Sequence, residues 1–294
     1  MSIELVPLDQ SFAHEVRGVR LWETLNDSVL DQLRAAFSLH PLLVFRRQCL
    51  DEDELVRVAA IFGRPAVYVE RSWHSSRPEV SVVSNMRNGE GELIGGLSSR
   101  ELNWHTDQSY NAHPVTGCFL YAQVVPNAGS VTSWVSLYDA YDALPASIRA
   151  SIEDAVGIFS YAARTYTVIP GGDGKALNQS YQERIRNSPD VKHPLVHRHP
   201  TSGRPSIYID PGTLVGIDGM DEQQARPIID ALQDHATAPG AAYAHRWQIG
   251  DLVLWDNAVT LHQRQAFGDH ECRLMKRMII DLPAERHVQP ALVA

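Results

Sequence analysis

The sequence predicts a mainly β protein with peripheral helices, most simply a two-sheet antiparallel jelly roll. Short apolar or alternating segments recur through most of the chain, turn-forming residues separate them, and only a few stretches show helical spacing. Many short strands combined with a few helices at the periphery are typical of a jelly roll.

The N-terminal part is expected to run strand, helix, strand and helix. Asp27 or Ser28 is placed to cap a helix that continues to about His40. Leu42–Phe45 is a short run of apolar residues and indicates a buried strand. Asp51–Ile61 carries apolar residues at helical spacing, and a Gly-Arg-Pro sequence soon afterwards ends the predicted helix.

Beyond about residue 80 the chain becomes β-rich. The segments expected as strands are bounded by Gly, Pro, Asn or Asp. They are Val80–Ser84, Trp104–Ser109, Gly117–Val125, Val131–Ser136, Gly157–Ala162, Leu195–His199, Ser206–Ile209, Ala244–Gln248, Asp251–Trp255 and Leu274–Ile280. Helical stretches are expected at about Tyr138–Val156, with Pro145 as a break, and at Asp221–Thr237.

No repeat, low-complexity tract or linker divides the chain, so residues 1–294 are expected to form a single domain. The segment 164–193 stands out because it is rich in Gly, Asn, Ser and charged residues and shows weak periodicity. Long stretches of this kind are usually functional or disordered. We interpret it as a lid over an active site, with a surface loop as the alternative.

Composition excludes several functional classes. Apolar residues make up 44% and charged residues 21%, as in an ordinary globular protein. A net charge of −9 without a basic stripe argues against a nucleic-acid partner. The three widely separated cysteines fit neither a disulfide framework nor a thiolate metal site. No signal peptide or membrane-length apolar run is evident, so a cytoplasmic enzyme without a membrane partner is expected.

The sequence Trp104-His105-Thr106-Asp107 holds the most informative pattern. Alternate residues of a strand face the same side, so His105 and Asp107 would project together. An imidazole beside a carboxylate supplies two ligands of a 2-His-1-carboxylate facial triad, which binds Fe(II) and leaves other coordination positions open. The pair alone is weakly specific, because a histidine bonded to a neighbouring carboxylate gives the same pattern.

A third ligand is expected from a distant segment. His262 follows a buried strand and a turn, and this arrangement would deliver a histidine into a jelly-roll cavity. Other histidines compete with it. His193, His197 and His199 lie close together without an acid at matching spacing, which favours a polar strand face, and His235, His245 and His287 have no ligand-like neighbours. The sequence favours His262 and leaves the choice open.

Two arginines belong to the last predicted strand. On a strand, Arg273 and Arg277 share one face and Lys276 lies on the other. Guanidinium groups facing a barrel interior would each need an anionic partner, because an unpaired buried charge is costly. A dicarboxylate cosubstrate and a carboxylate- or sulfonate-bearing substrate would supply two. The alternative, with both arginines facing solvent, remains open at this point.

As a set, these motifs resemble the family of taurine dioxygenase and the phenoxyacetate-herbicide dioxygenases, members of the Fe(II)- and 2-oxoglutarate-dependent oxygenases. The resemblance covers nearly the whole chain. It rests on LLVFRRQ (Leu42–Gln48), FGRP (Phe62–Pro65), NWHTDQSY (Asn103–Tyr110), PNAGSVTSW (Pro126–Trp134), YDALP (Tyr141–Pro145), GRPSIYIDPG (Gly203–Gly212), GDLVLWDN (Gly250–Asn257), and HQRQAF followed by the two arginines.

The resemblance implies the fold and the metal ligands. The family fold is the double-stranded β-helix, a jelly roll, which agrees with the predicted strands. Carried over residue by residue, the resemblance implies that His105, Asp107 and His262 bind Fe(II).

The resemblance also implies residues for the cosubstrate and the substrate. Arg273 would pair with the far carboxylate of 2-oxoglutarate, and Thr132 would hydrogen-bond it from the neighbouring strand. Arg277 matches a position that holds the anionic end of the substrate in the taurine enzyme. His74 lies near the usual substrate-contacting histidine but is offset from it.

Two positions depart from the family pattern. The usual Gly-Gly-Asp-Thr reads Gly-Ser-Val-Thr at Gly129–Thr132, so the turn before the threonine differs. Ala258 stands where an arginine commonly follows the Trp-Asp-Asn motif, which removes a charge near the metal-ligand loop. Neither change removes an expected ligand, but with the offset histidine they give no basis for choosing taurine or a phenoxyacetate as substrate.

The expected function is oxidation, by default hydroxylation, of a small carboxylate- or sulfonate-bearing molecule with O2, releasing succinate and CO2. Desaturation or cyclisation of a biosynthetic intermediate is the alternative within this class. A cupin-like metal-dependent hydrolase or lyase is the alternative outside it. Neither the substrate nor the formation of a homo-oligomer follows from the sequence.

Overall fold

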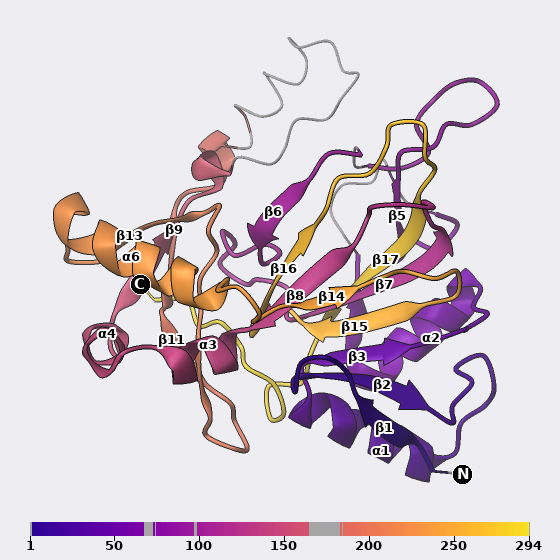
Figure 1. Ribbon diagram of the computed structural model, residues 1–294, viewed down its shortest axis with the longest axis horizontal. Coiled ribbons are helices and arrows are strands. Elements are labelled where there is room, and N and C mark those ends of the chain that lie inside the picture. Colours follow the sequence, from indigo (N-terminus) through magenta and orange to yellow (C-terminus); the bar gives the residue numbers. More distant parts are fainter. Residues whose placement is uncertain are drawn as a thin grey trace.

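The chain is mainly β with few helices, as the sequence predicts (Figure 1). The computed structural model describes residues 2–67, 73, 75–96, 99–164, 183 and 185–293. The helices described in full are α1 (Asp27–Leu39), α2 (Glu52–Phe62), α3 (Leu137–Ala143), α4 (Ala146–Ile152), α6 (Glu222–Ala236) and the short 3-10 helix η2 (Tyr161–Ala163). Among the described residues, no helix combines the length and apolar character needed to cross a membrane.

One layer is an eight-stranded sheet in the order β1-β2-β3-β15-β7-β17-β4, with β5 also paired to β17. Its strands are β1 (Glu4–Pro7), β2 (Ala13–Arg17), β3 (Leu42–Phe45), β4 (Arg64–Ala66), β5 (Ser81–Ser84), β7 (Gly117–Val124), β15 (Leu252–Asp256) and β17 (Leu274–Asp281). All its pairings are antiparallel except β2 with β3.

A second sheet has four antiparallel strands in the order β14-β8-β16-β6. They are β6 (Leu102–His105), β8 (Thr132–Ser136), β14 (Tyr243–His245) and β16 (Thr260–Arg264). Two smaller sheets follow the orders β10-β9-β13 and β11-β12. Their strands are β9 (Val156–Phe159), β10 (Val191–Pro194), β11 (Val196–Arg198), β12 (Pro205–Ile207) and β13 (Leu214–Ile217).

The two faces of the eight-stranded sheet bury different partners. On β3, Leu43 and Phe45 belong to the core formed with α1 and α2, whereas Leu42 and Val44 pack on the other face, in the core that contains Trp134 of the second sheet. In Figure 1, α1 and α2 accordingly lie on the side of the large sheet away from β6 and β16. Burial on both faces explains why β3 is an uninterrupted apolar run instead of an alternating one.

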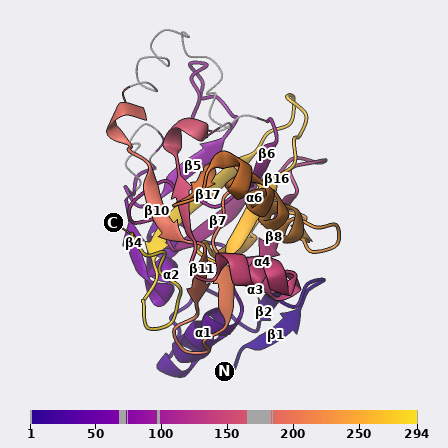
Figure 2. The same ribbon diagram turned by 90° about the vertical axis from the view of Figure 1, so that its left-hand side faces the viewer.

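The four-stranded sheet is also covered on both faces. Val135 of β8 and Leu261 of β16 point into a core with α3 and α6, which Figure 2 shows together beside this sheet. Their neighbours Trp134 and His262 face the opposite way, toward the large sheet, because successive residues of a strand alternate. This alternation places His262 between the two sheets.

The predicted helical segments are observed with two differences. The stretch expected to continue to Val156 ends with α4 at Ile152, because Val156 begins β9. Asn26, not Asp27 or Ser28, caps α1, with its Oδ1 accepting a hydrogen bond of 3.0 Å from the Val29 amide. The prediction was wrong because Asp and Ser are equally good caps, and sequence alone does not select among neighbouring candidates. Pro145 separates α3 from α4 as predicted.

Several strand and loop predictions need correction. The strand expected at Trp104–Ser109 ends at His105. The single strand expected at Leu195–His199 is only the short β11 (Val196–Arg198), and β10 precedes it in another sheet. Residues 191–193 of the expected lid belong to β10, and residues 165–182 and 184 lie outside the described part.

Candidate metal centre

His105, Asp107 and His262 meet between the two sheets. One potential ligand atom from each side chain lies within 4.8 Å of the others, and no other group of three such residues does so in the described part of the chain. The β6–β16 ladder pairs His262 directly with His105, and their ring centroids are 4.1 Å apart. His262 Nε2 lies 3.9 Å from Asp107 Oδ2. The structure therefore brings together the three predicted ligands.

A tight turn, and not the predicted strand, positions the side chain of Asp107 beside the two histidines. His105 is the last residue of β6, and the turn begins at Asp107. Gln108 has a left-handed backbone with φ of 61°, which costs a non-glycine residue about 1 kcal/mol. Its carbonyl accepts a 2.9 Å hydrogen bond from the Asn111 amide. His105 and Asp107 converge as predicted, but for a different geometric reason.

Each of the two histidines can offer a ring nitrogen to a metal. His105 Nδ1 lies 2.7 Å from the Asn103 carbonyl oxygen, which can only accept, so Nδ1 carries the hydrogen and Nε2 keeps its lone pair. Burial, and then the neighbouring His105, hold the pKa of His262 well below its usual value. His262 Nδ1 is buried without a hydrogen-bond partner among the described residues.

Asp107 is an ionised carboxylate in a polar setting. Arg277 donates to its Oδ2 at 2.6 Å, and the Cys118 thiol donates to the same atom at 3.5 Å. Burial acts to raise the pKa of Asp107, but the Arg277 guanidinium, followed by His262 and His105, outweighs it and leaves the pKa well below the usual value. One carboxylate and two imidazoles are the ligand set that suits Fe(II) in a facial triad.

The last strand shows the predicted alternation. Met275 packs in the core between the sheets, and Arg277 faces the same way, toward Asp107. Lys276 points to the other face, where its ammonium lies 2.8 Å from Glu52 of α2. The alternative in which the arginine side of this strand faces solvent is therefore wrong.

Arg273 is a buried cation immediately before β17. Its side chain is 3% exposed and makes no hydrogen bond or ion pair with the described residues, and its Nε is buried without a partner. Burial, and then the nearby Arg264, lower the pKa of Arg273 to about 9. A buried guanidinium without a counter-ion is strongly unfavourable, so this position fits an anionic ligand.

The backbone of Arg273 is held although its side chain is not. The Arg273 amide donates to Asn85 Oδ1 at 2.9 Å, and its carbonyl accepts from Ser84 Oγ at 2.8 Å. Asn85 Nδ2 also donates to the Glu271 carbonyl at 2.8 Å. These contacts from the end of β5 fix where the guanidinium begins.

Thr132 is the first residue of β8 and is buried opposite Arg264 of β16. Its Oγ1 accepts a 2.9 Å hydrogen bond from Trp247 Nε1. The preceding turn contains Ser130, which replaces a family glycine and adopts a left-handed φ of 58°. Ser130, one of the residues that depart from the family pattern, thus adopts a backbone conformation typical of glycine although it has a side chain.

The remaining histidines do not form metal groups with other described residues. His193, His197 and His199 are buried, so the expected polar strand face is wrong. His245 pairs with Asp251 at 3.1 Å and His287 with Asp256 at 2.9 Å, but neither pair is part of a group of three potential ligands among the described residues. His74 lies outside the described residues.

Several supporting residues were not predicted, namely Asn85, Trp247, Cys118 and Asn257. Asn257 is the one with a sequence signal, because a carboxamide follows the buried β15 directly and precedes His262 by only five residues. It is fully buried and bonds to the backbone of Asp107.

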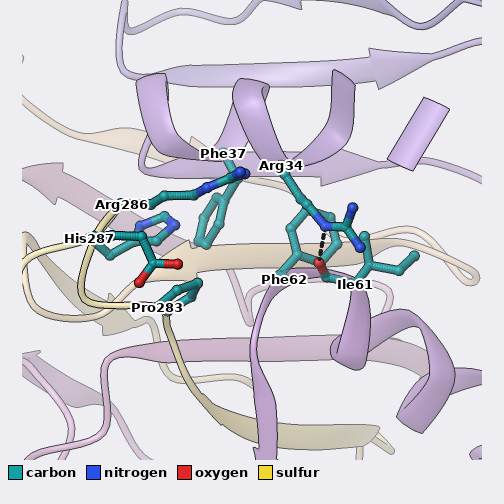
Figure 3. A pocket seen from close by; sticks show the side chains of 8 residues that line it. Arg34, Phe37, Ile61, Phe62, Pro283, Arg286 and His287 are labelled. Atoms are coloured by element: carbon teal, nitrogen blue, oxygen red, sulfur yellow. Dashed lines mark hydrogen bonds between the residues drawn. The ribbon is translucent and has the colours of Figure 1, made fainter. Parts of the chain in front are cut away.

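A pocket elsewhere in the molecule is separate from this centre. Figure 3 shows it between α1, α2 and the C-terminal segment, with Phe37 and Phe62 in its wall and Arg34 and Arg286 at its sides. None of the three clustered ligand residues lines it.

A mainly β fold with a His-Asp-His cluster between its sheets is the arrangement expected of a facial-triad metalloenzyme. The chain belongs to the taurine catabolism dioxygenase TauD, TfdA family, whose model matches residues 4–279. Enzymes of this family use Fe(II) and 2-oxoglutarate, and they act on small molecules with O2. The resemblance seen in the sequence is therefore confirmed.

Characterised relatives support the class. The chain is 28% identical to pentalenolactone F synthase of Streptomyces avermitilis, over 92% of each chain. It is 29% identical to the alpha-ketoglutarate-dependent 2,4-dichlorophenoxyacetate dioxygenase of Cupriavidus pinatubonensis, over 94% of this chain and 97% of the relative. It is 30% identical to the (S)-phenoxypropionate/alpha-ketoglutarate-dioxygenase of Sphingobium herbicidovorans, over 93% of each.

Solved structures agree. AAD-2 in complex with Mn(II) and N-oxalylglycine superposes with a TM-score of 0.76 at 26% identity, covering 98% of this chain and all of the other. A taurine dioxygenase from Burkholderia xenovorans gives a TM-score of 0.75 at 26% identity, covering all of this chain and 97% of the other. The names of these relatives and structures point to different substrates, so membership of the family does not fix the substrate.

Proposed function

We propose that this oxygenase binds Fe(II) through His105, Asp107 and His262 and oxidises a small organic anion. The observation that carries the proposal is the convergence of these three side chains within 4.8 Å. When bound, Fe(II) and 2-oxoglutarate supply the oxidation of an unactivated C–H bond by O2, with release of succinate and CO2. The protein contributes the ligand set, the orientation of both small molecules and the exclusion of water.

Arg273 and Thr132 are proposed to hold the far carboxylate of 2-oxoglutarate. Arg273 is a buried guanidinium whose side chain has no anion among the described residues. The hydroxyl of Thr132 already accepts from Trp247, so its own hydrogen is available to donate to a carboxylate. The positive charge of Arg264 near Arg273 adds to the attraction for an anion.

Arg277 is proposed to orient an anionic substrate beside the metal. It faces the space between the sheets and lies 2.6 Å from Asp107, so a carboxylate or sulfonate that it binds would be next to the iron ligands. His74 remains a proposed substrate contact. Hydroxylation is the default outcome, with desaturation or cyclisation as the alternative.

The eight-stranded and four-stranded sheets are interpreted as the two layers of a double-stranded β-helix, a jelly roll. Residues 1–294 are proposed to form a single domain around it, and the segment at about 164–193 is proposed as the lid. Two observations support this: the family model matches residues 4–279, and the four-stranded sheet supplies His105 and His262 while Arg277 of the eight-stranded sheet contacts Asp107.

Anaerobic titration with Fe(II) and 2-oxoglutarate tests the proposal. We expect the weak charge-transfer absorption of a chelated 2-oxo acid, and its perturbation by the true substrate in a panel of sulfonates, aryloxyalkanoates and amino acids. In air, that substrate should drive matched formation of succinate and oxidised product. A metal-dependent hydrolase or lyase would turn over substrate without 2-oxoglutarate, and this result would refute the proposal.

Arg277→Gln tests the substrate assignment. The variant should raise KM for the anionic substrate and leave that for a neutral analogue much less changed, with 2-oxoglutarate affinity retained. If only 2-oxoglutarate affinity changed, the proposed roles of the two arginines would be reversed.

A further inference from the structure

Asn257 holds both backbone groups of Asp107. Its Oδ1 accepts from the Asp107 amide at 3.0 Å, and its Nδ2 donates to the Asp107 carbonyl at 3.0 Å. The same Nδ2 donates to the Val115 carbonyl at 2.9 Å. The side chain is fully buried, so water does not compete for these bonds.

The backbone of Asn257 is itself anchored at two points. Its amide donates to the Thr116 carbonyl at 2.8 Å, and its carbonyl accepts from Thr106 Oγ1 at 2.6 Å. Asn257 therefore ties together both ends of the excursion between β6 and β7, which carries Asp107. It does so from the short connection between β15 and β16, the strand that carries His262.

This excursion needs such a contact for two reasons. The β6 ladder ends at His105, so no strand pairing fixes the backbone of Asp107. The next residue, Gln108, is in the left-handed region, a conformation that persists only where surrounding contacts enforce it. Arg277 meanwhile draws the carboxylate toward β17, so the direction of the Asp107 side chain depends on its backbone staying in place.

We infer that Asn257 is a positioning residue for the metal, which acts by fixing the backbone of Asp107 so that its carboxylate points at the two histidines. This inference rests on the proposed role of Asp107 as a ligand. Asn257 itself does not contact the metal position; its effect passes through the peptide groups on either side of Asp107. Partners that orient metal ligands typically change metal affinity by about 10- to 100-fold when they are lost.

The test is Mn(II) affinity of Asn257→Ala, measured by electron paramagnetic resonance without turnover. The variant should bind Mn(II) roughly 10- to 100-fold more weakly than wild type. Asn257→Ser keeps a small polar group at the position and should show a smaller loss. All measurements are made below the unfolding temperature of each variant, as followed by circular dichroism.

Gln48→Ala is the matched control. Gln48 is also a buried carboxamide with three hydrogen bonds to backbone, to Leu21, Arg46 and Val19. Its loss should lower the unfolding temperature and leave Mn(II) affinity unchanged. If Asn257→Ala lowered only the unfolding temperature, as Gln48→Ala does, the positioning role would be overturned. Failure of wild type to bind Mn(II) would instead refute the proposed function.

Discussion

The metal cluster and the surroundings of Arg273 differ in whether their buried charged group has a partner within the protein. The carboxylate of Asp107 has protein partners, Arg277 and the thiol of Cys118. The guanidinium of Arg273 has no side-chain partner among the described residues and is almost fully buried. The first region is a set of donors arranged for a cation, whereas the second carries an unmet charge that an anion would satisfy.

The two regions share the way in which they are positioned. In each region a side-chain carboxamide hydrogen-bonds to the backbone of the charged residue. Asn257 bonds to Asp107, and Asn85 bonds to Arg273. Fixing the backbone leaves the side-chain atoms available to a ligand. The comparison teaches that the asparagine side chains orient Asp107 and Arg273, whereas the side chains of Asp107 and Arg273 are left to bind the ligand. Substitutions can therefore change orientation and binding separately.

The largest expected effect is that of Asp107→Ala, which removes the anionic donor of the cluster. Metal affinity should fall by more than about 100-fold, and 2-oxoglutarate-dependent succinate formation should fall to background. Asp107→Asn is the control for structure, because its amide oxygen can still accept from Arg277 while the charge is gone. Asp107→Asn should fold nearly as well as wild type and bind metal poorly; tight metal binding by Asp107→Ala would contradict the cluster.

Arg273→Gln should weaken 2-oxoglutarate binding and spare the metal. A charge-assisted hydrogen bond contributes about 1.5–3 kcal/mol, or roughly 10- to 150-fold in affinity. Without 2-oxoglutarate, the free energy of unfolding should stay level or rise, because a buried unpaired cation is removed. Isothermal titration and denaturant unfolding measure the two quantities.

The same substitution at Arg64, whose side chain is 81% exposed on β4, is the control for Arg273→Gln. It should change neither quantity. A marked loss of stability in Arg273→Gln would show that the guanidinium already has a partner in the protein, and the contrast between the two regions would then be lost.

Asn85→Ala should have a smaller effect on the same ligand. It releases the Arg273 amide, so 2-oxoglutarate affinity should fall by about 2- to 10-fold, the equivalent of one neutral hydrogen bond. Its Mn(II) affinity should match that of wild type, whereas Asn257→Ala should show the reverse pattern. If either variant weakened both ligands equally, the two carboxamides would not act on separate regions.

The sequence predicted what depends on local patterns. Leu42–Phe45 forms β3 with the expected bounds because it is apolar on both faces. The helix expected at Asp221–Thr237 is α6 (Glu222–Ala236), which the structure shows to begin with a capping box of Asp221 and Gln224. The sequence also predicted that His105 and Asp107 lie together, because they are only two positions apart.

What the sequence did not predict depends on contacts between distant segments. Asn257 and Asp107 are 150 residues apart, and no local rule joins them. The strand β16 was missed because Thr260–Arg264 mixes apolar and polar residues without clear alternation. The left-handed Gln108 was missed because its sequence lacks the glycine that usually marks such a turn.

The smallest expected effect tests the orientation of the Thr132 hydroxyl. Trp247 donates to Thr132 Oγ1, so Trp247→Phe removes a hydrogen bond that aims the threonine O–H away from the indole. The affinity for 2-oxoglutarate should fall by roughly 2- to 5-fold, because only part of one hydrogen bond is lost. Thr132→Val, which removes the hydroxyl itself, should cost more.

A double-mutant cycle distinguishes orientation from general packing. If Trp247 acts through Thr132, the Trp247→Phe change should cost little in the Thr132→Val background, and the two free-energy changes should not add. Additive losses of affinity would mean that the indole of Trp247 affects 2-oxoglutarate binding by another route. One such route is its contact with His245, where the ring centroids are 4.5 Å apart. The metal affinity should be unaltered in all three variants, because neither side chain contacts the carboxylate of Asp107. The cycle then reports only on 2-oxoglutarate binding.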